Sequence, residues 1–144
     1  MGLILVAIDG SEGSDRAIDY AARRAKADVA DLLIVNIVGG YGLPETIFAA
    51  LTGDQSVWLR ELLESESATT LTKGRDRARN AGAGTVLLES RTGEVASSII
   101  EIAEEKGADA IVVGKSGLGR AGVLLGSVAQ KLVVLSRVPL TVVP

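Results

Sequence analysis

The chain has neither cysteine nor histidine among its 144 residues. Without cysteine it has no disulfide, no thiolate nucleophile and no zinc site built from thiolates. Without histidine it lacks imidazole metal ligands and the side chain whose pKa best suits acid–base catalysis near neutral pH. Enzyme classes that depend on a thiol or an imidazole are therefore excluded.

Long runs of one charge sign and long apolar runs are also missing. The 15 basic and 18 acidic residues are interspersed and give a net charge of -3, so no basic stripe indicates a nucleic acid or an anionic membrane as partner. The first apolar run, Leu3 to Ile8, is too short for a membrane span or a signal sequence, and no charged segment precedes it. These features predict a soluble, cytoplasmic protein, which also agrees with the lack of cysteine.

The length of the chain favours a single domain over residues 1–144. This many residues can form one substantial core but not two ordinary ones. The sequence has no internal repeat, no low-complexity segment and no charge block that would mark a linker.

Five short, mainly apolar runs predict strands, and the continuously apolar first run is expected to be covered on both faces, as in a parallel sheet. The predicted strands are Leu3–Ile8, Leu32–Val38, Thr85–Glu89, Ala110–Val113 and Leu140–Val143. Residues 39 to about 53 are rich in glycine and predict a long connection.

Helical spacing of apolar residues separates these strands. Ser11 or Ser14 is expected to cap a first helix, and Gly107 to end the third, which begins near Val95. The apolar positions of the first helix are Ile18, Ala21, Ala22, Ala25 and Val29; those of the second, from about 55 to 81, are Val57, Leu59, Leu62, Leu63 and Leu71; those of the last, Ser127–Ser136, are Val128, Leu132 and Leu135. Strict alternation of strand and helix predicts a doubly wound α/β fold: a five-stranded parallel sheet flanked by helices.

A ladder of glycines follows the fourth predicted strand, in the stretch VVGKSGLGRAGVLLGSV from Val112 to Val128. It is not a Walker loop, because the glycine required five positions before Gly114 is replaced by Asp109. It is not a dinucleotide fingerprint either, since that motif belongs to the first strand-to-helix turn. Glycines that end at a helix N-terminus, here near Ser127, favour an anion such as phosphate. A flexible loop with a helix cap is the alternative interpretation.

The order and spacing of several motifs resemble the universal stress protein (UspA-like) family over essentially the whole chain. The motifs are DGS at 9–11, VVGKSGLG at 112–119, LLGSVAQKLV at 124–133 and VPLTVV at 138–143. The resemblance implies a Rossmann-like fold of the adenine nucleotide alpha hydrolase-like type. It also implies a phosphate-binding pattern, to which Gly114, Gly117, Gly126 and Ser127 correspond. The spacer between the two halves, residues 118–125, is eight residues long, one fewer than in the ATP-binding pattern.

The resemblance implies a nucleotide site and no dedicated catalytic residue or protein-held metal. Asp9 would accept hydrogen bonds from the ribose, or alternatively cap the first turn. Ala7 and Ile8 would line the base and Val38 would offer backbone groups to adenine, although all three are also ordinary core residues. The implied site is Ala7, Ile8, Asp9, Val38, Gly114, Gly117, Gly126, Ser127 and Val128. The implied ligand is ATP or another adenine nucleotide, with Mg²⁺ held through its phosphates.

The resemblance also implies that the fifth strand lies at the edge of the sheet and that two subunits pair through this strand to form a homodimer. A bare apolar edge favours such association, and an edge covered by its own loops is the alternative. Three functions are then compatible with the sequence. The favoured one is a nucleotide-binding regulatory protein of the stress response with at most slow ATP hydrolysis. The others are a relative that binds no nucleotide and acts through protein contacts, and a phosphate-handling enzyme. The enzyme is disfavoured because no nucleophile–base pair is present.

Overall fold

The computed structural model describes residues 2–38, 50, 52–117 and 125–144. Its five parallel strands form one sheet in the order β3-β2-β1-β4-β5. The strands are β1 Leu3–Ala7, β2 Asp31–Val38, β3 Val86–Thr92, β4 Ala110–Gly114 and β5 Leu140–Val143. The strand order reverses between β1 and β4, which confirms the predicted doubly wound fold.

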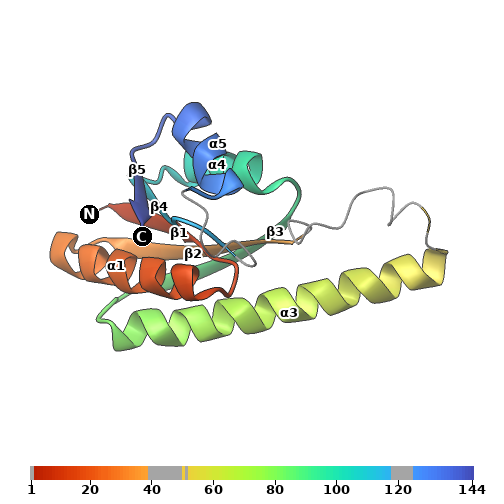
Figure 1. Ribbon diagram of the computed structural model, residues 1–144. Coiled ribbons are helices and arrows are strands. Elements are labelled where there is room, and N and C mark those ends of the chain that lie inside the picture. Colours follow the sequence, from red (N-terminus) through yellow and green to blue (C-terminus); the bar gives the residue numbers. More distant parts are fainter. Residues whose placement is uncertain (1, 39–49, 51, 118–124) are drawn as a thin grey trace.

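The helices cover both faces of this sheet (Figure 1). They are α1 Glu12–Asp28, α3 Gly53–Asn80, α4 Val95–Lys106 and α5 Ser127–Leu135. Helices α1 and α3 pack on one face, and α4 and α5 on the other. Among the described residues, no helix has both the length and the apolar character that a membrane crossing requires.

Strand β1 shows why its sequence is continuously apolar. Ile4 and Val6 point into the core beneath α1 and α3, whereas Leu5 belongs to the core beneath α4 and α5. All three side chains are at most 6% exposed. A strand with helices on both faces has no solvent-facing side, so the apolar and polar alternation of an ordinary half-buried strand does not occur.

The first helix begins as expected but ends earlier. Ser11 is its N-cap, and its side chain accepts a hydrogen bond from the amide of Ser14 at 3.1 Å. The expectation that Val29 faces inward is wrong, because Val29 is 70% exposed. Its backbone adopts the left-handed conformation, with φ at 53°, and ends the helix after Asp28. The apolar spacing therefore continued one residue beyond the helix.

Helix α3 runs unbroken from Gly53 to Asn80, and its N-terminal part extends well beyond the sheet (Figure 1). Leu63 and Leu71 are buried, but Val57 and Leu62 in the predicted apolar pattern are 55% and 42% exposed.

Other strand boundaries and one burial prediction also differ from the sequence predictions. Strand β1 ends at Ala7, β2 starts at Asp31 and β4 ends at Gly114, each one residue away from its predicted end. Strand β3 starts one residue later and ends at Thr92, beyond the predicted Glu89, because β2 pairs with it along its whole length. Leu135, at the end of α5, was expected to face inward but is 56% exposed, whereas Leu132 is fully buried. Helix α5 is short, and its last turn lies outside the core.

The N-terminus of α4 supports a pH prediction. Glu94 caps this helix by accepting hydrogen bonds from the side chain and the amide of Ser97, and it also pairs with Lys131 of α5 at 3.2 Å. The Ser97 hydroxyl and amide, with smaller help from Lys131, lower the pKa of Glu94 from 4.5 to about 2. A carboxylate with a lowered pKa stabilises the fold fully above its unfolded pKa and less as the pH falls through its folded value.

We therefore expect Glu94→Gln to lose about 1 kcal/mol of stability at neutral pH, the usual contribution of an N-cap. Its free energy of unfolding should also fall less steeply than that of the wild type between pH 4.5 and about 2. Urea titrations across this range measure both effects. Glu101→Gln, at an exposed glutamate of the same helix, is the control. Parallel pH profiles for the wild type and Glu94→Gln would contradict the assignment.

Candidate functional site

A cavity of about 330 Å³ lies at the carboxyl ends of the strands, next to the reversal of strand order between β1 and β4. Ligands of doubly wound proteins bind at this place. The structure brings together eight of the nine residues implied by the resemblance. Those that line the cavity are Ala7, Ile8, Asp9, Gly114, Gly117, Gly126, Ser127 and Val128.

Val38 is the exception, because it is not among the residues that line the cavity. Its carbonyl accepts a hydrogen bond from the amide of Gly93 at 3.1 Å, and its side chain is 5% exposed. The neighbouring Asn36 and Ile37 of β2 line the cavity instead. A role for Val38 in binding a base stays a prediction.

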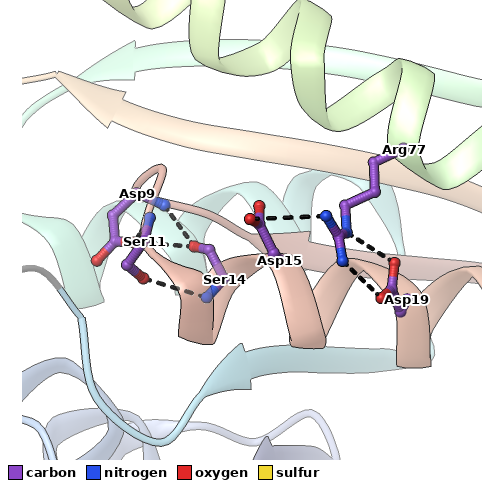
Figure 2. Close-up of polar contacts among 6 residues, drawn as sticks. All are labelled: Asp9, Ser11, Ser14, Asp15, Asp19 and Arg77. Atoms are coloured by element: carbon purple, nitrogen blue, oxygen red, sulfur yellow. Dashed lines mark hydrogen bonds and ion pairs between the residues drawn. The ribbon is translucent and has the colours of Figure 1, made fainter. Parts of the chain in front are cut away.

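Asp9 stands in a tight network at the turn between β1 and α1 (Figure 2). Its Oδ1 accepts hydrogen bonds from the amide of Ser11 and from the hydroxyl of Ser14, both at 2.9 Å. Its own amide donates to the Ser14 hydroxyl at 2.7 Å. The other carboxylate oxygen, Oδ2, faces Gly117, because a Cβ on that glycine would overlap it. Asp9 therefore both stabilises the turn and faces Gly117 of the glycine ladder.

The N-terminus of α1 approaches the end of β4 at backbone contact distance. A Cβ on Gly13 would lie 2.6 Å from the carbonyl oxygen of Ser116. A Cβ on Gly114 would lie 3.0 Å from the backbone of Gly13 in return. Position 13 therefore requires glycine and position 114 leaves little room for a side chain, so the first turn of α1 can lie against the start of the glycine ladder.

The two ends of the glycine loop meet despite the short spacer. The amide of Gly126 donates to the carbonyl of Lys115 at 2.8 Å, and the amide of Lys115 donates to the carbonyl of Val143 in β5 at 2.7 Å. Residues 118–124, which include Gly119, Arg120 and Gly122, lie outside the described residues. The two halves of the predicted phosphate-binding pattern, Gly114 with Gly117 and Gly126 with Ser127, therefore lie next to each other.

Helix α5 points its N-terminus at the cavity. Its N-cap is Gly126, which contributes no side-chain cap, whereas Ser11 caps α1 and Glu94 caps α4 through their side chains. The first helical hydrogen bond of α5 runs from the amide of Gln130 to the carbonyl of Gly126. The residues before it, Ser127, Val128 and Ala129, all line the cavity. Helix N-termini of this kind bind anions.

The cavity also has an apolar lining. It is formed by side chains from β1, β2, β4 and α4: Ala7, Val35, Ile37, Val95, Ile99 and Val113. Ala7 is small and sits at the end of β1, which leaves room in front of the sheet. A cavity lined by a helix N-terminus and by apolar side chains suits a ligand that joins a phosphate to a flat apolar ring.

Comparison with known proteins agrees with this geometry. The sequence pattern of the universal stress protein family matches residues 1–144. The chain belongs to the universal stress protein family. The universal stress protein YxiE of Bacillus subtilis is 35% identical over 147 aligned residues, which cover 97% of each chain.

Solved universal stress proteins share the fold. A universal stress protein in complex with cAMP is 30% identical, with a TM-score of 0.70, and the match covers 99% of this chain and 96% of that one. The universal stress protein UspA from Lactobacillus plantarum has a TM-score of 0.82 at 24% identity, over 99% of this chain and 97% of that one. The second similarity concerns the fold alone.

Sequence reasoning missed several residues of this universal stress protein site. Asn36 is the one polar residue inside the apolar run of β2, and buried polar groups in a strand nearly always have a partner. Gly13 lies in the first turn of a helix, where glycine is unfavourable unless a close contact needs it. The unusual residue type at each of these two positions is visible in the sequence, but it does not show which residue would be contacted.

The contact of Gly13 with Ser116 leads to a stability prediction. Gly13→Ala gains about 1 kcal/mol of helix propensity but forces the backbone apart, and such overpacking costs about 1–3 kcal/mol. We expect a net destabilisation of about 1 kcal/mol, measured by urea unfolding. Gly53→Ala is the matched control, because a Cβ there meets nothing within 4 Å. If Gly13→Ala is as stable as this control, the backbone at Ser116 can move aside without a cost in stability.

Proposed function

We propose that the protein is a regulatory universal stress protein that binds ATP or another adenine nucleotide. The observation that carries the proposal is the N-terminus of α5, capped only by glycine, at a cavity that is also lined by apolar side chains. The relative that binds cAMP supports an adenine nucleotide as the ligand. The lack of cysteine suits a reducing cytoplasm, where we place the protein.

Each part of the ligand has a matching part of the site. The amides of Ser127 and Val128 and the Ser127 hydroxyl would hold phosphate oxygens, helped by the dipole of α5. Asp9 would accept a hydrogen bond from a ribose hydroxyl. The apolar side chains of β2, β4 and α4 would pack against the base. No cluster of metal ligands occurs within the described ranges, so Mg²⁺ would enter bound to the phosphates.

The chain's residues support at most slow hydrolysis. Ser11 and Ser127 line the cavity, but no histidine exists to activate them. Turnover would then depend on how the site positions phosphate and water. Phosphate release from ATP far above that of a Gly126→Val protein would instead identify an enzyme.

Thermal unfolding with added nucleotide tests the proposal. A ligand at 100 times its Kd stabilises the native state by about 2.7 kcal/mol, which raises the Tm by several degrees. We expect this shift with at least one of Mg-ATP, ADP, AMP or cAMP at millimolar concentration, and a smaller one with GTP. Gly126→Val should remove the shift, since its side chain would meet the backbone of Lys115 and Ser116. No shift with any adenine nucleotide would refute nucleotide binding.

A homodimer through β5 is part of the proposal. The two edge strands differ in a way that supports it. Strand β3 carries a charged cluster on its outer part, where Arg91 pairs with Glu89 and with Glu105 of α4, each at 2.8 Å. Charged edges resist strand pairing. Strand β5 reads LTVV and has no charge, and the neighbouring α5 exposes Val133, Val134 and Leu135.

The alternative, a protein that acts only through protein contacts, is favoured by a different surface. The part of α3 that extends beyond the sheet exposes Val57 and Trp58, the latter by 64%. Replacing Trp58 with alanine and recovering binding partners from cells tests this alternative. It gains support if partners depend on Trp58 and are recovered equally well with Gly126→Val.

A further inference from the structure

The peptide group between Ile8 and Asp9 is held from both sides. Its carbonyl, on Ile8, accepts a hydrogen bond from the side-chain amide of Asn36 at 2.8 Å. Its amide, on Asp9, donates to the hydroxyl of Ser14 at 2.7 Å. This peptide lies just past the end of β1 and directly follows the last ladder bond, which runs from the Ile8 amide to the Val35 carbonyl at 2.9 Å. Its orientation therefore depends on two side chains.

Asn36 is itself held in place by two hydroxyls, that of the buried Ser67 and, behind it, that of the exposed Ser90. The hydroxyl of Ser67, in α3, donates to Asn36 Oδ1 at 2.6 Å. Ser67 Oγ also lies 2.9 Å from Ser90 Oγ in β3. Because the one hydrogen of Ser67 is directed to Asn36, Ser90 is the donor in the second bond. Asn36 is 2% exposed and Ser67 is completely buried.

The bonding partners also fix which way the Asn36 amide points. The Ile8 carbonyl can only accept a hydrogen bond, so it requires the amide nitrogen of Asn36 on that side. The Ser67 hydroxyl then meets the amide oxygen. Hydrogen-bonded chains in a buried setting are strong when complete and unfavourable when one partner is removed. The chain from Ser90 to Ile8 thus gives the end of β1 one preferred backbone orientation.

We propose that Asn36 is a positioning residue for Asp9. It fixes the plane of the peptide that precedes Asp9, and with it the direction in which the Asp9 carboxylate points. Ser67 supports it from α3. The claim that Asn36 positions Asp9 depends only on the contacts described above. The claim that this positioning affects ligand binding rests on the proposed nucleotide function.

The first test needs no ligand. Hydrogen exchange of the Asp9 amide, measured by NMR, reports directly on its bond to Ser14. In Asn36→Leu we expect this amide to exchange about tenfold faster relative to the Leu33 amide of the core, a factor that corresponds to the loss of about one hydrogen bond. An equal rise at both amides reports a general loss of stability, whereas a rise at Asp9 beyond that at Leu33 reports the loss of the local bond.

Two further variants keep this test decisive. Ser67→Ala makes a smaller change, and it should raise the same ratio by severalfold even if Asn36→Leu does not fold. Ser98→Ala replaces a serine of α4 that is 5% exposed and lies outside the chain of hydroxyls, and it should leave the ratio unchanged. An unchanged ratio in both Asn36→Leu and Ser67→Ala would overturn the proposal, whether or not the protein binds nucleotides.

The second test compares ATP with 2′-deoxy-ATP by isothermal titration calorimetry. If Asp9 receives the ribose hydroxyl, the wild type should prefer ATP, and Ser67→Ala should reduce that preference severalfold. A merely structural loss would weaken both ligands equally. If Ser67→Ala lowers the affinity for ATP and for 2′-deoxy-ATP equally, the claim that the positioning of Asp9 affects binding is wrong. A wild type that binds neither ligand would refute the proposed function, while the exchange ratio would still decide on Asn36.

Discussion

Gly117→Ala is expected to weaken adenine-nucleotide binding about a hundredfold, the loss that corresponds to one or two hydrogen bonds to charged groups. The new Cβ would overlap Oδ2 of Asp9. The carboxylate cannot simply turn away, because its Oδ1 accepts bonds from Ser11 and Ser14 at 2.9 Å each. Either these bonds break or the glycine loop moves away from the cavity, and both changes disturb the site.

Isothermal titration calorimetry with the tightest-binding adenine nucleotide measures this loss. Gly84→Ala is the matched control, because a Cβ at that exposed position meets nothing within 4 Å. Its affinity should equal that of the wild type. If Gly117→Ala also binds like the wild type, then neither Asp9 nor the loop at Gly117 takes part in binding.

Most of the fold could be predicted because its signals are local. Because helices cover both faces of the sheet, the apolar run of β1 is continuous and that of β2 is interrupted only by Asn36. The alternation of strands and helices then leaves few topologies. The errors occurred where the helical spacing of apolar residues continues beyond the end of the helix or beyond the part of it that reaches the core. Val29 continues the spacing of α1 after the helix has ended, and Leu135 continues that of α5 beyond the core.

The candidate site was predicted in part for a related reason. The glycine ladder and Asp9 lie next to predicted strand ends, so the topology alone brings them together. The contact of Gly13 with Ser116 and the bond of Asn36 to Ile8 join segments that are far apart in sequence. No spacing rule along the chain shows such a pair, even though the unusual residue at each position is visible.

Val142→Pro is expected to convert the proposed homodimer into a folded monomer. The amide of Ile111 bonds to the carbonyl of Pro139, and that of Lys115 to the carbonyl of Val143. Backbone groups alternate in direction along a strand, so those of Val142 face the open edge. Proline there removes a donor needed by a partner strand without removing a bond to β4, and edge strands tolerate proline.

Sedimentation equilibrium at micromolar concentration distinguishes the two states. We expect the mass of a dimer for the wild type and of a monomer for Val142→Pro. Thr141→Pro is the contrasting variant, because the amide of Thr141 faces β4 and its loss should destabilise the subunit itself by about 3 kcal/mol. If the wild type is monomeric, or Val142→Pro stays dimeric, β5 is not the interface. The exposed Val133, Val134 and Leu135 of α5 would then need another partner, since an apolar surface beside a bare edge strand promotes association.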